Sequence, residues 1–257
     1  MILTLDVGNT NIKTAVFNGE TLVNYWRLNT NTTETSDEIG IKLAMLFAHN
    51  GLDMRAITGI ILSSVVPSIN FTLEHMCRSY FDRDPMQVVP GVKTGSNIKY
   101  ENPRELGSDR IANAVAAYAI YGGPSIVIDF GTATTFGVVN ENAEFIGGAI
   151  CPGLKLSMEA LVSGAAKLPR VEIVKPASPI GRNTVTNMQA GIFYGFVGQV
   201  NHIVSKLKGE IGRPDARVIA TGGLSRLIAT DTRAIDVVDG LLTLKGLRMI
   251  YERNHPE

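Results

Sequence analysis

Two stretches decide the fold of this 257-residue chain: Ile2-Leu3-Thr4-Leu5-Asp6-Val7-Gly8-Asn9-Thr10 and Ser125-Ile126-Val127-Ile128-Asp129-Phe130-Gly131-Thr132-Ala133-Thr134-Thr135. In each stretch an apolar run ends in an aspartate, and a glycine and hydroxyl side chains follow. A second strand-like run comes after each turn, over residues 12–17 and 136–139. Each Asp-x-Gly turn is therefore predicted to be the tip of a β-hairpin.

The residue types of these turns suit a phosphate chain. A carboxylate at a strand end can hold a hydrated cation, and a glycine lets backbone N–H groups turn toward an anion. A surface hairpin is the simpler interpretation of either copy alone, because Asp and Gly favour turns for local reasons. The repetition favours a duplicated domain that holds one nucleotide from both sides.

The composition excludes several classes of protein. Lys plus Arg and Asp plus Glu both number 24, so no global basic field would attract nucleic acid or an anionic membrane. No apolar run approaches the roughly 20 residues of a membrane helix, and the chain starts with a strand instead of a signal peptide. Cys77 and Cys151 are the only cysteines, which favours free thiols in a reducing compartment. We expect a cytoplasmic protein with a small-molecule partner, and neither a nucleic-acid nor a membrane partner.

Strand and helix patterns alternate along the chain, as in α/β domains. An alanine-rich helical segment over 110–121 ends at the breaker Gly122-Gly123-Pro124, and we place the domain boundary in this region. The predicted domains are 1–115 and 116–257, and the last helix, about 239–251, can pack back on the first domain. Further helices are expected over 37–50, 71–81 and 184–207, and further strands over 59–66, 86–89 and 217–221.

A third glycine-rich turn, Gly222-Gly223, follows a predicted strand. Glycines there let a base or ribose approach the backbone, although a tight strand-to-helix turn explains the pair alone equally well. With the two Asp hairpins, this turn gives the order of the actin-like, Hsp70-like and sugar-kinase superfamily: two phosphate hairpins, then an adenosine turn. The expected fold class is α/β, with two duplicated actin-like (ribonuclease H-like) ATPase domains and a nucleotide cleft between them. The chain has no Gly-x-x-x-x-Gly-Lys-Ser/Thr sequence, which excludes a P-loop.

The substrate side is predicted from the loop Tyr100-Glu101-Asn102-Pro103-Arg104-Glu105-Leu106-Gly107-Ser108-Asp109-Arg110. Asp109 stands where the alanine-rich helix begins, so it is a candidate N-cap. It is also a candidate acceptor for the proton of an attacking alcohol, with Arg110 pairing with an anionic substrate group. Both interpretations hold if Ser108 caps the helix and Asp109 faces the substrate.

Over essentially its whole length the chain resembles type III pantothenate kinases, a bacterial family with some members first described as Bvg accessory factors. The matching motifs are Asp6-Val7-Gly8-Asn9-Thr10, Glu101-Asn102-Pro103-Arg104-Glu105, Gly107-Ser108-Asp109-Arg110, Asp129-Phe130-Gly131-Thr132-Ala133-Thr134, Gly147-Gly148 with Pro152-Gly153, Gly181-Arg182-Asn183-Thr184 and Thr221-Gly222-Gly223-Leu224. The resemblance implies ATP-dependent phosphorylation of pantothenate to 4′-phosphopantothenate, the first step of coenzyme A biosynthesis. Two alternatives remain: another small-molecule kinase of the superfamily, against which the Gly-Ser-Asp-Arg loop argues, and a non-catalytic nucleotide-binding regulator, against which Asp109 argues.

The resemblance also implies roles for individual residues. Asp109 would be the catalytic base, and Asp129 would help to hold a monovalent cation, K⁺ or NH₄⁺, in addition to the Mg²⁺ that accompanies ATP. The implied ATP contacts are Asp6, Val7, Gly8, Asn9, Thr10, Asn11, Ile12, Lys13 and Thr132. The implied pantothenate contacts are Tyr100, Gly107, Ser108, Asp109, Arg110 and Thr184, and Thr184 would reach the substrate of the neighbouring subunit in a homodimer. Many relatives have an apolar residue in place of Lys13, so its ammonium is not expected to be essential.

Overall fold

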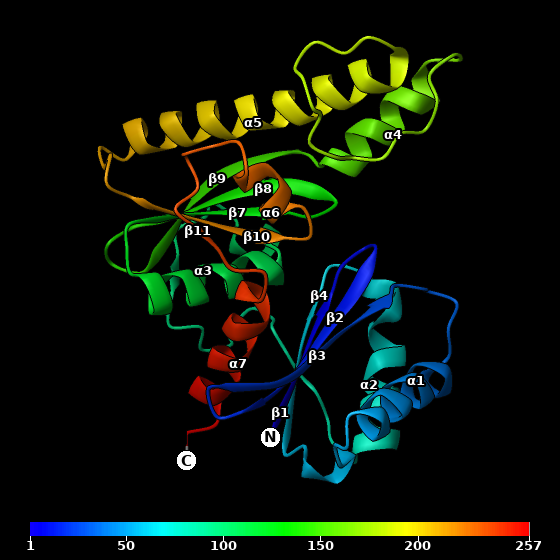
Figure 1. The fold of residues 1–257 in the computed structure, drawn as a ribbon. Helices are drawn as coiled ribbons and strands as arrows, with labels where there is room; N and C mark the ends of the chain where they lie inside the picture. Colours follow the sequence, from blue (N-terminus) through cyan, green and yellow to red (C-terminus); the bar gives the residue numbers. More distant parts are fainter. Residues whose placement is uncertain (257) are drawn as a thin grey trace. The chain divides into compact units, whose positions relative to one another are not determined.

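The computed structural model describes residues 1–256, which form two compact units (Figure 1). Unit 1 consists of Met1–Ser96, Glu101–Ala116 and the C-terminal segment that starts at Thr243. Unit 2 consists of Asn97–Tyr100 and Ala117–Leu242. The predicted domain limits, 1–115 and 116–257, remain a prediction.

The sheet of unit 1 is built from five strands: β1 (Ile2–Val7), β2 (Asn11–Asn18), β3 (Thr21–Asn29), β4 (Gly59–Ser64) and β5 (Met86–Gln87). Their order is β3-β2-β1-β4-β5. The first three strands are an antiparallel meander, while β4 is parallel to β1 and β5 is parallel to β4. The hairpin predicted at Asp6 joins β1 to β2 and is confirmed.

Two helices, α1 (Ser36–His49) and α2 (Asn70–Phe81), lie on one face of this sheet (Figure 1). A capping box starts α1: the Thr35 hydroxyl accepts the Glu38 N–H, and the Thr35 N–H donates to the Glu38 carboxylate. Phe47 of α1 packs in the core between Trp26 and Phe81, with ring centroids 5.2 and 5.6 Å away. Short 3₁₀ turns are η1 (Met54–Ala56), η2 (Pro67–Ile69) and η3 (Pro103–Glu105).

The sheet of unit 2 repeats that of unit 1 and adds one strand. Its strands are β6 (Asn97–Ile98), β7 (Ser125–Phe130), β8 (Ala133–Val139), β9 (Glu144–Pro152), β10 (Arg217–Gly222) and β11 (Val237–Val238). The order is β11-β10-β7-β8-β9-β6, so β9-β8-β7-β10-β11 corresponds to β3-β2-β1-β4-β5. The pairing directions also correspond, because β7, β8 and β9 are an antiparallel meander and β10 and β11 follow in parallel. The predicted duplication of an actin-like, ribonuclease H-like domain is confirmed.

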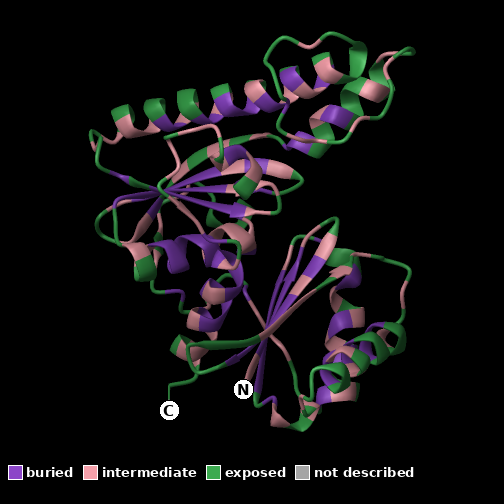
Figure 2. Ribbon diagram, in the orientation of Figure 1, coloured by how far each residue is buried: buried purple, intermediate pink, exposed green. Residues whose placement is uncertain are grey.

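Helices pack on this second sheet through buried apolar side chains (Figure 2). The helices of unit 2 are α4 (Leu154–Gly164), α5 (Thr184–Glu210) and α6 (Ser225–Ala229). The inner side of α5 contributes Phe193, Val197, Val200 and Val204 to the core. Two helices contain residues of both units: α3 (Ser108–Tyr121), which passes into unit 2 at Ala117, and α7 (Leu242–Asn254), which passes into unit 1 at Thr243. Within residues 1–256, the model contains no helix of the length and apolarity that a membrane crossing requires.

Candidate active site

The first Asp-Gly turn lies at the carboxyl end of β1. Its hairpin closes with a hydrogen bond of 3.0 Å from the Gly8 N–H to the carbonyl oxygen of Asn11. The Thr30 hydroxyl donates to the carbonyl oxygen of Gly8 over 2.6 Å, which ties the turn to the end of β3. Asp6 is buried and opposite Lys13 in the ladder, and the two side chains form an ion pair of 3.0 Å. The turn is therefore held firmly, and the charge of its aspartate is balanced within the hairpin.

The predicted ATP contacts of this hairpin fall into two groups. Asn9 and Thr10 are exposed at the turn, and Gly8, Asn11 and Lys13 are half-buried. The side chains of Val7 and Ile12 are buried in the core, so only their backbone groups can serve a ligand.

The start of α3 is attached to the same edge of the sheet. β4 runs parallel to β1 with Ser63 opposite Asp6, so the carboxyl ends of both strands lie side by side. The hydroxyls of Ser63 and Ser108 form a buried hydrogen bond of 2.9 Å. The Asp-Gly turn thus follows β1, and the start of α3 is attached to the end of β4, which is the neighbouring parallel strand. Ligands of α/β sheets commonly bind at the carboxyl ends of such parallel strands.

Asp109 stands in the first turn of α3, where Ser108 is the first helical residue. Ser108, considered above as a possible cap, is itself the first helical residue, and its hydroxyl forms a hydrogen bond with the Ser63 hydroxyl. Gly107 precedes the helix, and its carbonyl oxygen accepts the Ile111 N–H over 3.2 Å. The carboxylate of Asp109 accepts the Arg110 N–H over 2.8 Å. A Cβ on Gly107 would lie 2.5 Å from that carboxylate, so a side chain here would make the Asp109 carboxylate move.

The rest of the substrate loop is shaped by local bonds. The Asn102 side chain accepts the Arg104 N–H over 3.3 Å and donates to the Glu105 carboxylate over 2.7 Å, which fixes η3. Arg110 is half-buried in unit 1. Tyr100 belongs to unit 2, where its ring centroid lies 6.1 Å from that of Phe145.

The second Asp-Gly turn has the same closing bond as the first. The Gly131 N–H donates to the carbonyl oxygen of Ala133 over 3.0 Å, and Asp129 lies opposite Thr135 in the ladder. Thr132 is exposed at the tip. The Gly153 N–H donates to the carbonyl oxygen of Thr132 over 3.0 Å, and Gly153 is the N-cap of α4. The amino end of an eleven-residue helix is therefore beside the turn, where its dipole favours a bound anion.

The predicted adenosine turn lies next to Asp129. β10 is parallel to β7, with Thr221 opposite Asp129. Gly222 has a φ of +90°, and a Cβ there would lie 2.6 Å from both the Asp129 carboxylate and the carbonyl oxygen of Phe130. Only glycine allows this close approach of the two strands at their ends.

A pocket of about 310 Å³ opens beside this turn, within unit 2. Leu224, which follows the glycine pair, lines it together with one side of α4 and the segment after that helix: Lys155, Met158, Glu159, Val162, Arg170, Val171, Glu172 and Ile173. α4 lines this pocket with one side and begins, at its N-cap Gly153, beside the second Asp-Gly turn.

Thr184 is the first residue of α5 and is exposed. The helix starts with a capping box in which the Asn183 side chain accepts the Thr186 N–H over 2.9 Å. Ile180 and Val185, on either side of this loop, are exposed to 77% and 41%. Thr184 belongs to unit 2, whereas Asp109 belongs to unit 1.

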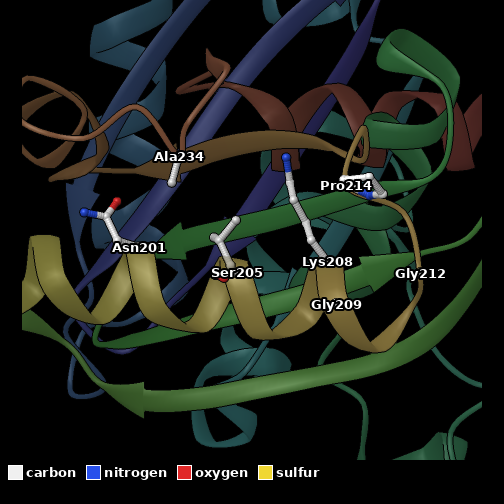
Figure 3. Close-up of a pocket in the computed structure, with 8 residues that line it drawn as sticks. Asn201, Ser205, Lys208, Gly209, Gly212, Pro214 and Ala234 are labelled. Atoms are coloured by element: carbon white, nitrogen blue, oxygen red, sulfur yellow. The ribbon is translucent and has the colours of Figure 1, made fainter.

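A second pocket, of about 540 Å³, lies against the C-terminal half of α5 (Figure 3). Lys208 is the one charged side chain among its lining residues, which are Asn201, Val204, Ser205, Lys208, Gly209, Gly212, Pro214 and Ala234. None of them is a predicted site residue. The described residues, 1–256, contain no cluster of three or more His, Cys, Asp or Glu side chains arranged to hold a metal ion.

Two functional features were missed by sequence reasoning. Ser63 holds the start of α3, and Gly153 brings the amino end of α4 to the turn at Thr132. A signal existed for Ser63, because a serine pair at the end of an otherwise apolar strand is unusual. Gly153 was recognised only as part of a motif.

The family model and the curated relatives agree on one family. A family model described as type III pantothenate kinase matches residues 2–206. A type III pantothenate kinase of Bacillus cytotoxicus is 56% identical over 254 residues, which are 99% of this chain and 97% of that protein. Another, of Halalkalibacterium halodurans, is 53% identical over 254 residues, which are 99% of this chain and 100% of that protein. A crystal structure of a conserved Baf family protein from Campylobacter jejuni covers 99% of this chain and 100% of its own, with a TM-score of 0.62 and 20% identity, a likeness of fold alone.

Proposed function

This chain belongs to the type III pantothenate kinase family, and on this basis we propose that it transfers the γ-phosphoryl group of ATP to the primary hydroxyl of pantothenate. The products are 4′-phosphopantothenate and ADP, in the first step of coenzyme A biosynthesis. One observation carries the assignment to the residues. The Ser63–Ser108 bond holds the start of α3, with Asp109, at the edge of the sheet where the Asp6 turn also lies. A phosphate donor and a hydroxyl acceptor can then be bound at one edge.

Asp109 is the group that orients the pantothenate hydroxyl and accepts its proton. Its carboxylate lies in the first turn of α3, where the helix dipole stabilises the negative charge. In a loose phosphoryl-transfer transition state the proton leaves late, so positioning of the hydroxyl contributes more than basicity. Gly107 keeps the space in front of this carboxylate open, Ser108 anchors it, and Arg110 and Tyr100 bind the carboxylate and polar groups of pantothenate.

ATP is held by the two Asp-Gly turns. The backbone N–H groups and hydroxyls of residues 8–11, together with Thr132, contact the phosphates, and the amino end of α4 adds positive potential beside Thr132. Asp6 and Lys13 complete the first turn. Adenosine lies at the Gly222-Gly223 turn and in the pocket beside Leu224. When bound, Mg²⁺ neutralises phosphate charge, which is the main source of acceleration in such a reaction.

A monovalent cation site is proposed at Asp129. The carboxylate lies 2.6 Å from where a Cβ would stand on Gly222, and the carbonyl oxygen of Phe130 is as close to that point. Carboxylate and carbonyl oxygens therefore lie close together at the ends of β7 and β10, and oxygen donors of this kind suit a hard cation such as K⁺. Asp129 would hold the ion there, with NH₄⁺ as a substitute of similar size.

The active enzyme is a homodimer in which Thr184 of one subunit reaches the pantothenate of the other. Exposed Ile180 and Val185 beside Thr184 support this, because apolar side chains at this exposure favour burial against a partner. Two inactive variants, Asp109→Asn and Thr184→Arg, should recover roughly a quarter of wild-type activity when subunits exchange at random, since half of the dimers are mixed and half of their sites intact. A mixture that stays inactive despite verified exchange excludes the shared site.

We also propose a cytoplasmic location, which the two free thiols of Cys77 and Cys151 support. Burial raises the pKa of the Cys77 thiol to about 12, so this thiol stays protonated and structural.

A coupled assay of ADP release tests the function itself. ADP should appear only when ATP, Mg²⁺ and pantothenate are all present. ADP release that accepts other small alcohols but not pantothenate would indicate a different kinase of the superfamily. Nucleotide binding without ADP release in any mixture would indicate a non-catalytic regulator that only binds nucleotide.

A further inference from the structure

We propose that α7 is a positioning helix that holds both ends of the substrate segment, defined here as residues 93–113. This inference rests on the proposed function, because the segment contains the predicted pantothenate contacts on the same subunit: Tyr100, Gly107, Ser108, Asp109 and Arg110. The family model ends at residue 206, so α7 lies outside the matched region. All the anchoring contacts described below lie within unit 1.

The C-terminal end of α7 anchors the start of the segment. The Asn254 side chain accepts the Lys93 N–H over 3.1 Å and donates to the carbonyl oxygen of Lys93 over 2.9 Å. This pair of bonds imitates the backbone pairing of a strand and fixes Lys93 in one orientation. The Arg253 guanidinium donates to the carbonyl oxygen of Thr94. Three bonds to consecutive residues therefore leave the segment little freedom where it begins.

The N-terminal end of α7 anchors the other end of the segment, within α3. The Thr243 hydroxyl donates to the Asn113 side chain over 2.8 Å, and both residues are buried. One turn further, a Cβ on Gly246 would overlap the carbonyl oxygen of Ala112, so the two helix backbones are in direct contact. This contact lies one turn after Asp109 in α3. A shift of α7 would consequently displace the carboxylate that accepts the substrate proton.

α7 is itself fixed to the sheet that carries the site. The Tyr251 side chain packs directly on Gly59 at the start of β4, where a Cβ would overlap the phenol ring. The far end of β4 holds Ser108 through Ser63. α7 thus contacts both β4 and α3, and β4 also contacts α3 through Ser63. Through these contacts α7 fixes both ends of the substrate segment relative to the sheet.

Paired variants test each anchor against a matched control. Asn254→Ala removes the bonds to Lys93, and Asn50→Ala is its control. Each asparagine lies at the end of a helix and donates to the carbonyl oxygen four residues before it, over 2.7 Å for Asn50 and 2.8 Å for Asn254. Thr243→Val removes the bond to Asn113 at nearly constant volume, and Thr243→Ser keeps the hydroxyl.

The expected result differs between the substrates. Asn254→Ala and Thr243→Val should each raise the KM for pantothenate or lower kcat about fivefold, with the KM for ATP within about twofold, from the free energy of one to two hydrogen bonds. Asn50→Ala and Thr243→Ser should match the wild type. Hydrogen exchange provides a readout independent of turnover: the Lys93 amide should exchange faster in Asn254→Ala and not in Asn50→Ala.

The two proposals fail in distinguishable ways. A wild-type protein without pantothenate-dependent ADP release contradicts the proposed function, whatever the variants do. Wild-type activity together with anchor variants that match their controls, in both KM for pantothenate and kcat, contradicts the positioning role of α7. An equal rise of both KM values would also contradict it, because that result indicates a general loss of structure.

Discussion

The two Asp-Gly turns have the same backbone design and different surroundings. Both close with a bond of 3.0 Å, from Gly8 to Asn11 and from Gly131 to Ala133. Asp6 is buried and paired with Lys13 at 3.0 Å, whereas Asp129 is more exposed and lies against the Gly222 backbone. The aspartate of the first turn is therefore paired with a lysine of its own hairpin, and for the second turn we propose an external cation. The duplicated fold thus contains the same turn twice, and the residues around each copy differ.

The largest effect is expected when the cation dependence of activity is compared between variants of Asp6 and Asp129. Asp129→Asn should lower pantothenate-dependent ADP release on the order of a hundredfold and abolish a preference for K⁺ or NH₄⁺ over Na⁺. The reason is that the variant lacks the carboxylate proposed to hold the cation that stabilises the charge of the transition state. Asp6→Asn should reduce the rate and keep the cation preference. Rates measured in KCl, NH₄Cl and NaCl give the cation preference of each variant. A preference that survives Asp129→Asn, or disappears in Asp6→Asn, reverses the assignment.

The next largest effect is expected when α4 is moved away from the second Asp-Gly turn. A Cβ on Gly153 would lie 2.6 Å from the carbonyl oxygen of Gly131 and overlap that of Thr132, so Gly153→Ala must push the amino end of α4 away from the turn. The KM for ATP should rise about tenfold as the helix N–H groups lose their position. Gly164→Ala, at the other end of α4 with no heavy atom within 4 Å of the new Cβ, is the control. Equal KM values for the two variants would show that α4 does not serve the nucleotide.

Lys13 should have the smallest effect on turnover. Lys13→Met removes the internal cation of the first turn, yet the phosphates retain the backbone donors, so kcat and the KM for ATP should change less than about threefold. Stability should fall by about 1–3 kcal/mol, since Asp6 stays buried without its partner. Urea denaturation measures this loss, and Lys13→Met combined with Asp6→Asn should recover part of it. A collapse of turnover in Lys13→Met would mean that this ammonium contacts the phosphates.

Local sequence signals predicted the two hairpins but did not predict β3, β9 or the contacts between distant residues. The hairpins at Asp6 and Asp129 follow from turn chemistry within a few residues, and both are present. Local sequence offers Ser108 only as a possible cap, and it cannot show the hydrogen bond that Ser108 forms with Ser63, 45 residues earlier. Asn254 bonds Lys93 across 161 residues, a contact that no local pattern encodes.

We propose that Asp109 accepts the substrate proton. Asp109→Asn measures it most directly, because asparagine retains an oxygen that can accept the Arg110 N–H at the start of α3. Pantothenate-dependent ADP release should fall on the order of a hundredfold or more in this variant, while the melting temperature and the affinity for ATP stay nearly unchanged. A variant of wild-type stability that retains most of its turnover would contradict the account and leave Asp109 only a structural part at the start of the helix.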